Sequence, residues 1–449
     1  MLFYQPTVNL APSLSTSRFL RLAKESIWIA VGQGTAVIGA LSGIRILSEM
    51  MTPSEYGLLA LGMTLATFSG QTLFGPLCAG AGRFYALAQE AGALRLYLKG
   101  VRKLVLFASG IILLMAGGVT IVTALAGGSH WLPLIIAALI FSAVTGFNSL
   151  ASGIQNVARQ RAIVALHAGM ASWGRFIAAA GLMLMLGVSS AVAMWGYVIA
   201  TAIVLGSQYL FFRPIMQSAR AEITAGQSTS EQWQAKILRY SWPFATWGVF
   251  ASFQVASDRW ALAMFSSPTD VGLFAVLYQL GYYPVALFTE MLVTVVSPVL
   301  FQRAGDGVSS QRLGNAGALT RWIMSAVLLV AVAIFLVTFL VHDWIFHMFV
   351  AKQYASVSHL LPWLILSSGI FAAGQVLSID RMNALDTKAL IAPKVITAIM
   401  GGLLNILGAY LYGLEGVVAA SLLFSVIYFG WLFLQHSNLA LQPITGMDA

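Results

Sequence analysis

Long hydrophobic stretches with very few charges follow one another along the chain, separated by short basic segments or by prolines and glycines. About 20 consecutive apolar residues in a helix cross the hydrocarbon core of a bilayer. The stretches lie at 26–48, 56–79, 104–127, 132–152, 162–186, 191–212, 241–264, 271–300, 322–341, 359–379, 391–411 and 415–434. The pattern predicts an all-α polytopic membrane protein with about twelve transmembrane helices.

Basic residues fall on alternate sides of these predicted spans. Most of the 24 lysines and arginines lie on one side, whereas the loops on the opposite side hold Lys352. Since loops rich in lysine and arginine stay in the cytoplasm, we expect both termini to be cytoplasmic.

A short motif occurs twice. Residues 54–61 read SEYGLLAL and residues 269–276 read TDVGLFAV, each at the start of the second span of its half. A second echo links QNVARQRAI at 155–163 with MNALDTKAL at 382–390. These echoes predict a duplicated six-helix unit, unless the first motif is merely a similar turn signal in both places. Because six is even, the two lobes would be parallel repeats around a central cavity.

The longest polar segment divides these halves. We expect a cytoplasmic N-terminal segment, an N-lobe, a cytoplasmic linker, a C-lobe and a cytoplasmic tail. In that order they cover residues 1–25, 26–212, 213–240, 241–434 and 435–449.

The composition excludes several classes of protein. Hydrophobic residues make up 59% of the chain and charged residues 9%, a balance that no water-exposed globular surface keeps. Cys78 is the single cysteine, no histidine pair has a metal-ligand spacing, and there is no Gly-Lys-Ser/Thr phosphate loop. We therefore expect no cofactor or metal, no enzyme and no ATP-driven pump. The net charge of +9 favours contact with anionic membrane lipids over nucleic acid.

Three arginines lie inside predicted spans. A charge near the bilayer centre costs about 2.5–3.5 kcal/mol, so it usually serves a partner or an aqueous pathway. Arg45 and Arg259 precede the repeated glycines, Gly57 and Gly272, by nearly the same distance and could offer one phosphate two guanidinium groups. Arg45 could instead reach the outer headgroups, and Arg259 could pair with Asp258 or Asp270.

Four further charged residues are candidates for the site. Arg175, in the middle of the fifth span, could face the cavity or a neighbouring helix, and Arg83 could receive a headgroup at the cytoplasmic mouth or anchor the second span. Glu290 and Asp258 are the acids within hydrophobic runs. Either could carry a coupling proton or pair with an arginine.

Several segments together carry a family resemblance. They are TPSEYGLLAL, AGAGRFY, SDRWALAMFSSPTDVGLFAV, HMFVAKQYASVSHLLPWLIL and NILGAYLYGLEGVVAASLL. In order and spacing the chain resembles the polysaccharide transporters, or lipid-linked oligosaccharide flippases, of the multidrug/oligosaccharidyl-lipid/polysaccharide exporter superfamily.

The resemblance implies two six-helix bundles facing a cationic cavity that opens alternately to the two sides of the membrane. It implies an undecaprenyl-diphosphate-linked oligosaccharide as substrate, for O-antigen, lipopolysaccharide or exopolysaccharide assembly. It also implies that the protein lies in a bacterial cytoplasmic (inner) membrane. It also implies charge at the positions of Arg45 and Arg259. A polysaccharide polymerase or ligase would consume the substrate outside and so sustain its transfer, or protons or sodium would drive the transfer through Glu290 or Asp258.

Three other functions compete with this one. A multidrug or cation antiporter of the same superfamily would prefer acidic cavity residues. A lipid II flippase usually has two further C-terminal spans. A membrane glycan polymerase or ligase would usually carry catalytic groups on a sizeable outward loop, and the longest such loop here, at about 342–358, is short.

Overall fold

The structure, a computed structural model, consists of helices joined by short turns, with no strand among its described residues. These are residues 16–125, 128–221, 229–286, 310–383 and 391–441, with 288, 289, 292, 296 and 300. The α-helices are α1 Thr16–Met50, α2 Pro53–Glu90, α3 Leu94–Leu125, α4 Leu132–Val157, α5 Arg161–Leu186, α6 Ser190–Ala221, α7 Ser230–Phe265, α8 Pro268–Leu277, α10 Ser310–Phe349, α11 Leu361–Asn383 and α12 Ile391–Leu441. A π-helix, η2 Tyr278–Tyr282, continues α8, and two 3-10 helices are η1 Ser129–Trp131 and η3 Lys352–Leu360.

The helices account for the predicted spans. Among the described residues, eight helices are long and apolar enough to cross a membrane. The last of them, α12, makes two passes, because Gly413 adopts φ +58° and ψ −131°, a conformation that glycine alone adopts readily. Gly408 and Gly416 then lie backbone to backbone across the hairpin. With α1, α7 and the α8–η2 segment beside them, the arrangement is the expected twelve-helix membrane fold.

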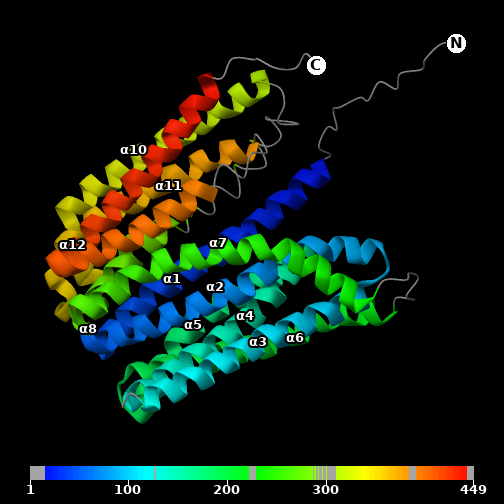
Figure 1. Ribbon diagram of the computed structural model, residues 1–449, viewed down its shortest axis with the longest axis horizontal. Helices are drawn as coiled ribbons and strands as arrows, with labels where there is room; N and C mark the ends of the chain where they lie inside the picture. The colour runs from blue at the N-terminus through cyan, green and yellow to red at the C-terminus, as the bar shows by residue number, and fades with distance from the viewer. Residues whose placement is uncertain are drawn as a thin grey trace.

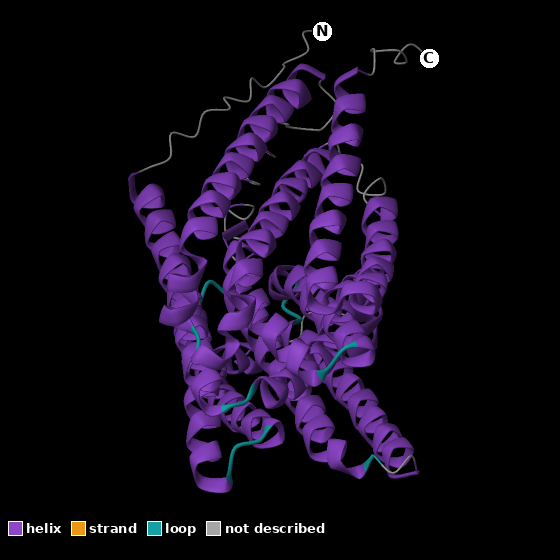
Figure 2. Ribbon diagram, turned by 90° about the vertical axis from the view of Figure 1, so that its left-hand side faces the viewer, coloured by secondary structure: helices purple, strands orange, loops and turns teal. Residues whose placement is uncertain are grey.

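The two lobes lie side by side. In Figure 1, α3 to α6 lie on one side of α1 and α7, and α10 to α12 lie on the other. Helix α1 begins and helix α12 ends toward the same end of the molecule (Figure 2), which we call the terminal end. The opposite end, where α1 is followed by α2 and α7 by α8, is the distal end.

Buried side chains show where the lobes are joined. At the distal end a single hydrophobic core includes residues of both lobes, among them Leu47 and Tyr56 with Phe274 and Tyr354. Toward the terminal end the core divides into two. One cluster belongs to α2, α3, α4, α6 and the start of α7, and the other belongs to α10, α11 and α12. The lobes are therefore sealed together distally and packed separately toward the terminal end.

The repeated motif forms two helix starts at this distal seal. Thr52 caps α2 by accepting a hydrogen bond from the backbone N–H of Glu55 (3.3 Å), and Ser267 caps α8 in the same way with Asp270 (3.1 Å). A proline follows each cap as the first helical residue, the position at which its missing N–H costs nothing. The two copies are thus equivalent in local structure.

The two motif glycines then pack directly against each other. A Cβ at Gly57 would overlap the carbonyl oxygen of Pro268, and a Cβ at Gly272 would overlap that of Pro53. Each residue also lies close to the backbone nitrogen of the other glycine. Only residues without a side chain let α2 and α8 cross this closely, so the motif is repeated because both helices meet at the same crossing.

The predicted linker at 213–240 is partly helical. Helix α6 ends at Ala221 and α7 begins at Ser230. The first half of α7 packs against the N-lobe: Ser241 donates a hydrogen bond to the carbonyl of Pro76 (2.8 Å), and the rings of Trp233 and Tyr97 meet edge to face. Helix α7 therefore starts on the N-lobe and enters the C-lobe toward its distal end.

The close crossing at Gly57 and Gly272 predicts that a side chain at either position weakens the distal seal. Gly57→Val should force α2 away from α8, since overpacking costs about 1–3 kcal/mol, and should weaken the seal by about tenfold or more. The measurement is the labelling of a cysteine at Thr67, which lines the central cavity, by an impermeant maleimide added to intact cells of a Cys78→Ser background. Labelling should be faster in Gly57→Val.

Gly181→Val provides the matched control, because a Cβ there meets nothing within 4 Å. Equal labelling rates in the two valine variants would show that the crossing does not seal the distal end.

Candidate functional site

A cavity of about 340 Å³ lies between the two lobes. Helices α1, α2, α5 and α6 line it from the N-lobe, and α7, α8 and η2 line it from the other side. Its polar lining consists of Tyr56, Thr64, Thr67, Ser172, Arg175, Tyr197, Ser252, Arg259, Tyr278, Gln279 and Tyr283. Among the described residues, the lining holds two arginines and no carboxylate, so this part of the cavity is cationic.

Arg259 lies on the distal side of this cavity and is 8% exposed. Its Nη1 lies 3.3 Å from Asp258 Oδ1 and donates a hydrogen bond to the Val255 carbonyl (3.1 Å). The guanidinium lies over the ring of Tyr278, 4.4 Å from its centroid, in a cation–π contact. Arg259 therefore forms the ion pair with Asp258 that the sequence allowed, and its guanidinium also faces the cavity.

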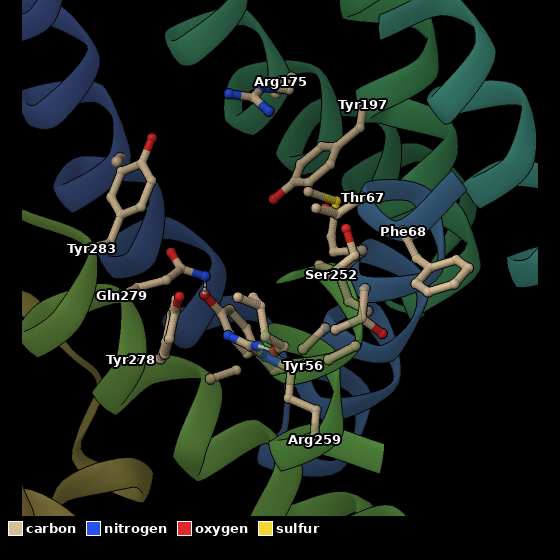
Figure 3. Close-up of a pocket in the computed structure, with 18 of the residues that line it drawn as sticks. Tyr56, Thr67, Phe68, Arg175, Tyr197, Ser252, Arg259, Tyr278, Gln279 and Tyr283 are labelled. Atoms are coloured by element: carbon tan, nitrogen blue, oxygen red, sulfur yellow. Dashed lines mark hydrogen bonds between the residues drawn. The ribbon is translucent and has the colours of Figure 1, made fainter. Parts of the chain in front are cut away.

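Arg175 projects into the cavity from α5, across from Arg259 (Figure 3). Its Nε donates a hydrogen bond to the Ala171 carbonyl (2.9 Å), and no described carboxylate pairs with it. A guanidinium offers five N–H donors. Arg175 therefore presents unused donors and an uncompensated charge to whatever enters.

Hydrogen bonds between the lobes lie at the distal floor of the cavity. Gln279 donates to the hydroxyl of Tyr56 (2.9 Å), and the Trp260 indole donates to Thr64 Oγ1 (2.9 Å). Tyr56 also meets the ring of Tyr354 edge to face. The floor of the cavity is thus made of the contacts that hold the lobes together.

A smaller polar space of about 30 Å³ lies beside the cavity in the C-lobe. Its polar lining includes Gln254, Asp258, Asn405, Ser367, Ser421 and Ser425. Asp258 is 6% exposed, and Asn405 donates a hydrogen bond to Ser257 (2.9 Å). The space is large enough for one water molecule or one small cation.

Arg45 lies elsewhere, contrary to the expectation that it and Arg259 would share one anion. It forms an ion pair with Glu49 and donates hydrogen bonds to the carbonyls of Val350 (2.6 Å) and His347 (3.2 Å). These carbonyls are at the C-terminal end of α10, where the helix dipole favours a cation. Arg45 therefore joins α1 to α10 at the distal seal and does not line the cavity.

Arg45 and Arg259 differ in register. Arg259 lies one residue farther from the end of α7 than Arg45 lies from the end of α1. Along a helix, one residue turns a side chain by about 100°. The two arginines therefore point in different directions from equivalent helices.

The remaining candidates have different positions. Arg83 is exposed near the terminal end of α2 and is not a lining residue. Glu290 lies outside the described residues. Of two neighbouring tyrosines, Tyr283 lines the cavity, whereas Tyr282 stacks on Tyr278 with ring centroids 4.7 Å apart and lines the smaller space.

Sequence reasoning did not single out Tyr56, Tyr278 or Gln279 as lining residues. Tyr56 is the third residue of the first motif copy, where Val271 stands in the second. The motif places Tyr56 near the distal seal, but the direction of its side chain toward the cavity depends on how α2 is rotated against α8. Tyr278 and Gln279 begin the π-helix, whose wider turn the apolar pattern does not reveal.

Comparison with known proteins identifies the family. The sequence profile of the polysaccharide biosynthesis protein family matches residues 22–303, which is more than half of the chain. The chain belongs to this family. No curated protein sequence matches the chain.

Solved structures with the same fold include a lipid II flippase and multidrug resistance transporters. The lipid II flippase MurJ in an inward closed conformation has a TM-score of 0.67 at 15% identity, covering 93% of this chain and 90% of its own. An inward-facing multidrug resistance MATE family transporter of the MOP superfamily has a TM-score of 0.66 at 13% identity, covering 90% and 95%. An outward-facing MATE structure scores lower, 0.58 at 13% identity, covering 93% and 96%. The family member described here therefore has the two-lobed fold of these transporters, and it is a multi-pass membrane protein.

The buried Asp258–Arg259 pair predicts unequal costs for removing the two cavity arginines. Removing one partner of a buried ion pair costs about 3–5 kcal/mol, because the other charge is left uncompensated. Arg259→Met should therefore lower the thermal unfolding temperature of the purified protein clearly more than Arg175→Met does. The double variant Asp258→Asn/Arg259→Met should recover most of the loss. Equal unfolding temperatures for the two single variants would contradict this assignment.

Proposed function

We propose that this protein is a flippase that moves an undecaprenyl-diphosphate-linked oligosaccharide across the cytoplasmic membrane by alternating access. The observation that carries the proposal is the cavity between the lobes, into which Arg175 presents its guanidinium. Within the described part of the chain, no carboxylate pairs with Arg175 or lines this cavity. Membership of the polysaccharide biosynthesis protein family supports the saccharide part of this substrate. O-antigen, lipopolysaccharide or exopolysaccharide assembly would use such a step.

The distribution of basic residues supports an orientation. The ends of α2, α4 and α6 at the terminal end carry Arg83, Arg159 and Arg213, and the positive-inside rule places such an end in the cytoplasm. With both termini cytoplasmic, the distal seal faces outward and the lobes separate toward the cytoplasm. This is the side on which a lipid-linked precursor would enter.

The cavity fits the chemistry of the headgroup. Guanidinium groups bind phosphate oxygens through charge-assisted hydrogen bonds, which replace the hydration that a diphosphate loses when it enters the protein. The hydroxyls of Tyr197, Tyr283 and Ser252 offer hydrogen bonds to sugars. A volume of about 340 Å³ suits the diphosphate and the first sugar, while the polyprenyl chain stays in the bilayer.

Translocation requires the distal seal to open while the terminal ends close. The Gly57–Gly272 crossing and the Gln279–Tyr56 hydrogen bond must both break for the cavity to reach the outside. Because this hydrogen bond lies on the cavity floor, substrate bound above it can compete for the same groups. Binding would then weaken the seal that holds the inward state.

Binding by itself does not drive net transfer. Consumption of the outward product by a polysaccharide polymerase or ligase lowers its concentration and draws the substrate across. Asp258 is a second source of coupling, because its small polar space suits a proton or one sodium ion next to Arg259. Protonation or cation binding there would compete with the Arg259 guanidinium for the carboxylate.

The cavity's charge separates this proposal from the competing functions. A cation antiporter needs carboxylates to bind its substrate, and the described cavity lining has none. A lipid II flippase would carry the same diphosphate, so the glycan decides between the two. The distal segments that the structure describes, such as η3 with its 9 residues, are short for the catalytic domain of a glycan polymerase.

Proteoliposomes provide the test. An undecaprenyl-diphosphate-linked oligosaccharide is placed in vesicles with the purified protein, and its outward sugar is detected with a membrane-impermeant probe. Exposure should depend on the protein and should fall about tenfold to a hundredfold in Arg175→Glu, since a hydrogen bond to a charged group contributes about 1.5–3 kcal/mol. Arg321→Glu makes the same charge change on the exposed surface of α10 and should transport normally.

Two results would overturn the proposal. The first is the absence of protein-dependent exposure with any of a range of glycans under imposed proton or sodium gradients, together with cation efflux under the same gradients, which would identify an antiporter. The second is an equal loss in Arg175→Glu and Arg321→Glu, which would show that the cavity arginine does not bind the headgroup. Selective exposure of lipid II would reassign the substrate.

A further inference from the structure

A second and larger hollow lies on the N-lobe, away from the central cavity. It has a volume of about 680 Å³ and is formed by the terminal halves of α3, α4 and α6. No residue lines both this groove and the central cavity. The groove is therefore a site separate from the central cavity.

One end of the groove is basic. Arg95, Lys99 and Arg102 line it from the first two turns of α3, at spacings of four and three residues that place them on one helix face. All three side chains are exposed, and none forms an ion pair or hydrogen bond within the described part of the chain. Three unpaired positive charges are thus gathered at the mouth of one groove.

The opposite face of α3 has its partners already. Tyr97 packs on Trp233, and a Cβ at Gly100 would lie 2.9 Å from the carbonyl oxygen of Ser230, so the start of α7 covers this face. Lys103 forms an ion pair with Glu231 (2.7 Å) and, by donating a hydrogen bond, lowers the pKa of that carboxyl to about 2. The three groove cations have no such carboxylate partner among the residues that the structure describes.

The rest of the groove is apolar. Val105 and Leu106 of α3, Phe147 and Ile154 of α4, and Tyr209 and Phe212 of α6 form its walls. Arg95 and Leu106 are separated by about 16 Å along the axis of α3. In a membrane, this part of α3 would run from the bilayer surface into the hydrocarbon. The groove thus changes from cationic to apolar in the direction in which a lipid changes from headgroup to acyl chain.

We propose that this groove binds an anionic phospholipid of the cytoplasmic leaflet. Its phosphate lies among Arg95, Lys99 and Arg102, and one acyl chain lies between α3, α4 and α6. The charge complementarity supports this occupant, because basic pockets between transmembrane helices on the cytoplasmic side suit anionic headgroups. A volume of about 680 Å³ is within the range of ligand pockets and accommodates one chain.

Such a lipid would stabilise a particular part of the fold. It holds α3 against α4 and α6 on one side, while α3 holds the start of α7 on the other. Since α7 passes from the N-lobe into the C-lobe, the bound lipid braces the helix that connects the two. The inference does not depend on what the central cavity carries.

Native mass spectrometry of the full chain in detergent tests the proposal. The protein is titrated with phosphatidylglycerol and, separately, with phosphatidylcholine of the same acyl chains. We expect phosphatidylglycerol to bind with about tenfold or greater preference, since each surface lysine or arginine adds to the attraction for an anionic headgroup.

Two variants address the two ends of the groove. The triple variant Arg95→Gln/Lys99→Gln/Arg102→Gln should lose the preference for phosphatidylglycerol. Ala151→Trp, which fills the apolar part without changing charge, should weaken binding of both lipids. The control is Lys236→Gln/Arg239→Gln/Arg321→Gln, which removes the same charge from exposed positions outside the groove and should keep the preference. Thermal unfolding in lipid-free detergent establishes that each variant is folded.

Three results would overturn the proposal. They are equal affinities for the two phospholipids, an equal loss of preference in the groove and control triples, and unchanged binding in Ala151→Trp. Preferential binding of undecaprenyl diphosphate, lost in the same groove variants, would assign the groove to the substrate lipid instead. Because the readout is lipid binding, a failed flipping assay would leave these outcomes unaffected.

Discussion

The close crossing of α2 and α8 at Gly57 and Gly272 is the contact on which the rest of this structure depends. It brings two helix backbones together where any side chain would overlap a carbonyl oxygen. Around it, the distal parts of both lobes share one hydrophobic core, whereas the terminal halves have separate cores. A cavity closed at one end follows directly, because the lobes are held at the crossing and packed independently beyond it.

Equivalent positions in the two lobes perform different tasks. Arg259 lines the cavity beside a buried aspartate, whereas Arg45 ties α1 to the C-terminal end of α10. A shift of one residue relative to the helix end separates these roles, because it turns the side chain about the helix axis. Arg175, which has no counterpart in the repeated motif, supplies the second cavity cation. A duplicated scaffold thus carries an asymmetric site.

Helix α7 links the cavity with the membrane surface. Its start is held by α3 through Trp233 and the Lys103–Glu231 pair, and its distal half carries Asp258 and Arg259. A lipid seated on the other face of α3 acts on the same helix from outside. Helix α7 therefore connects the charged groups at the membrane surface with the charged groups of the cavity.

The sequence by itself determined the fold class, the number of spans and the pairing of the two motif copies, because these follow from local properties. Apolar run length, the positions of lysine and arginine, and cap-plus-glycine spacing are all readable along the chain. Only the tertiary structure decided which charged side chains face the cavity, because that depends on helix rotation and on register between elements distant in sequence. It separated Arg175 from Arg45, and it brought Arg95, Lys99 and Arg102 over an apolar groove built from three helices.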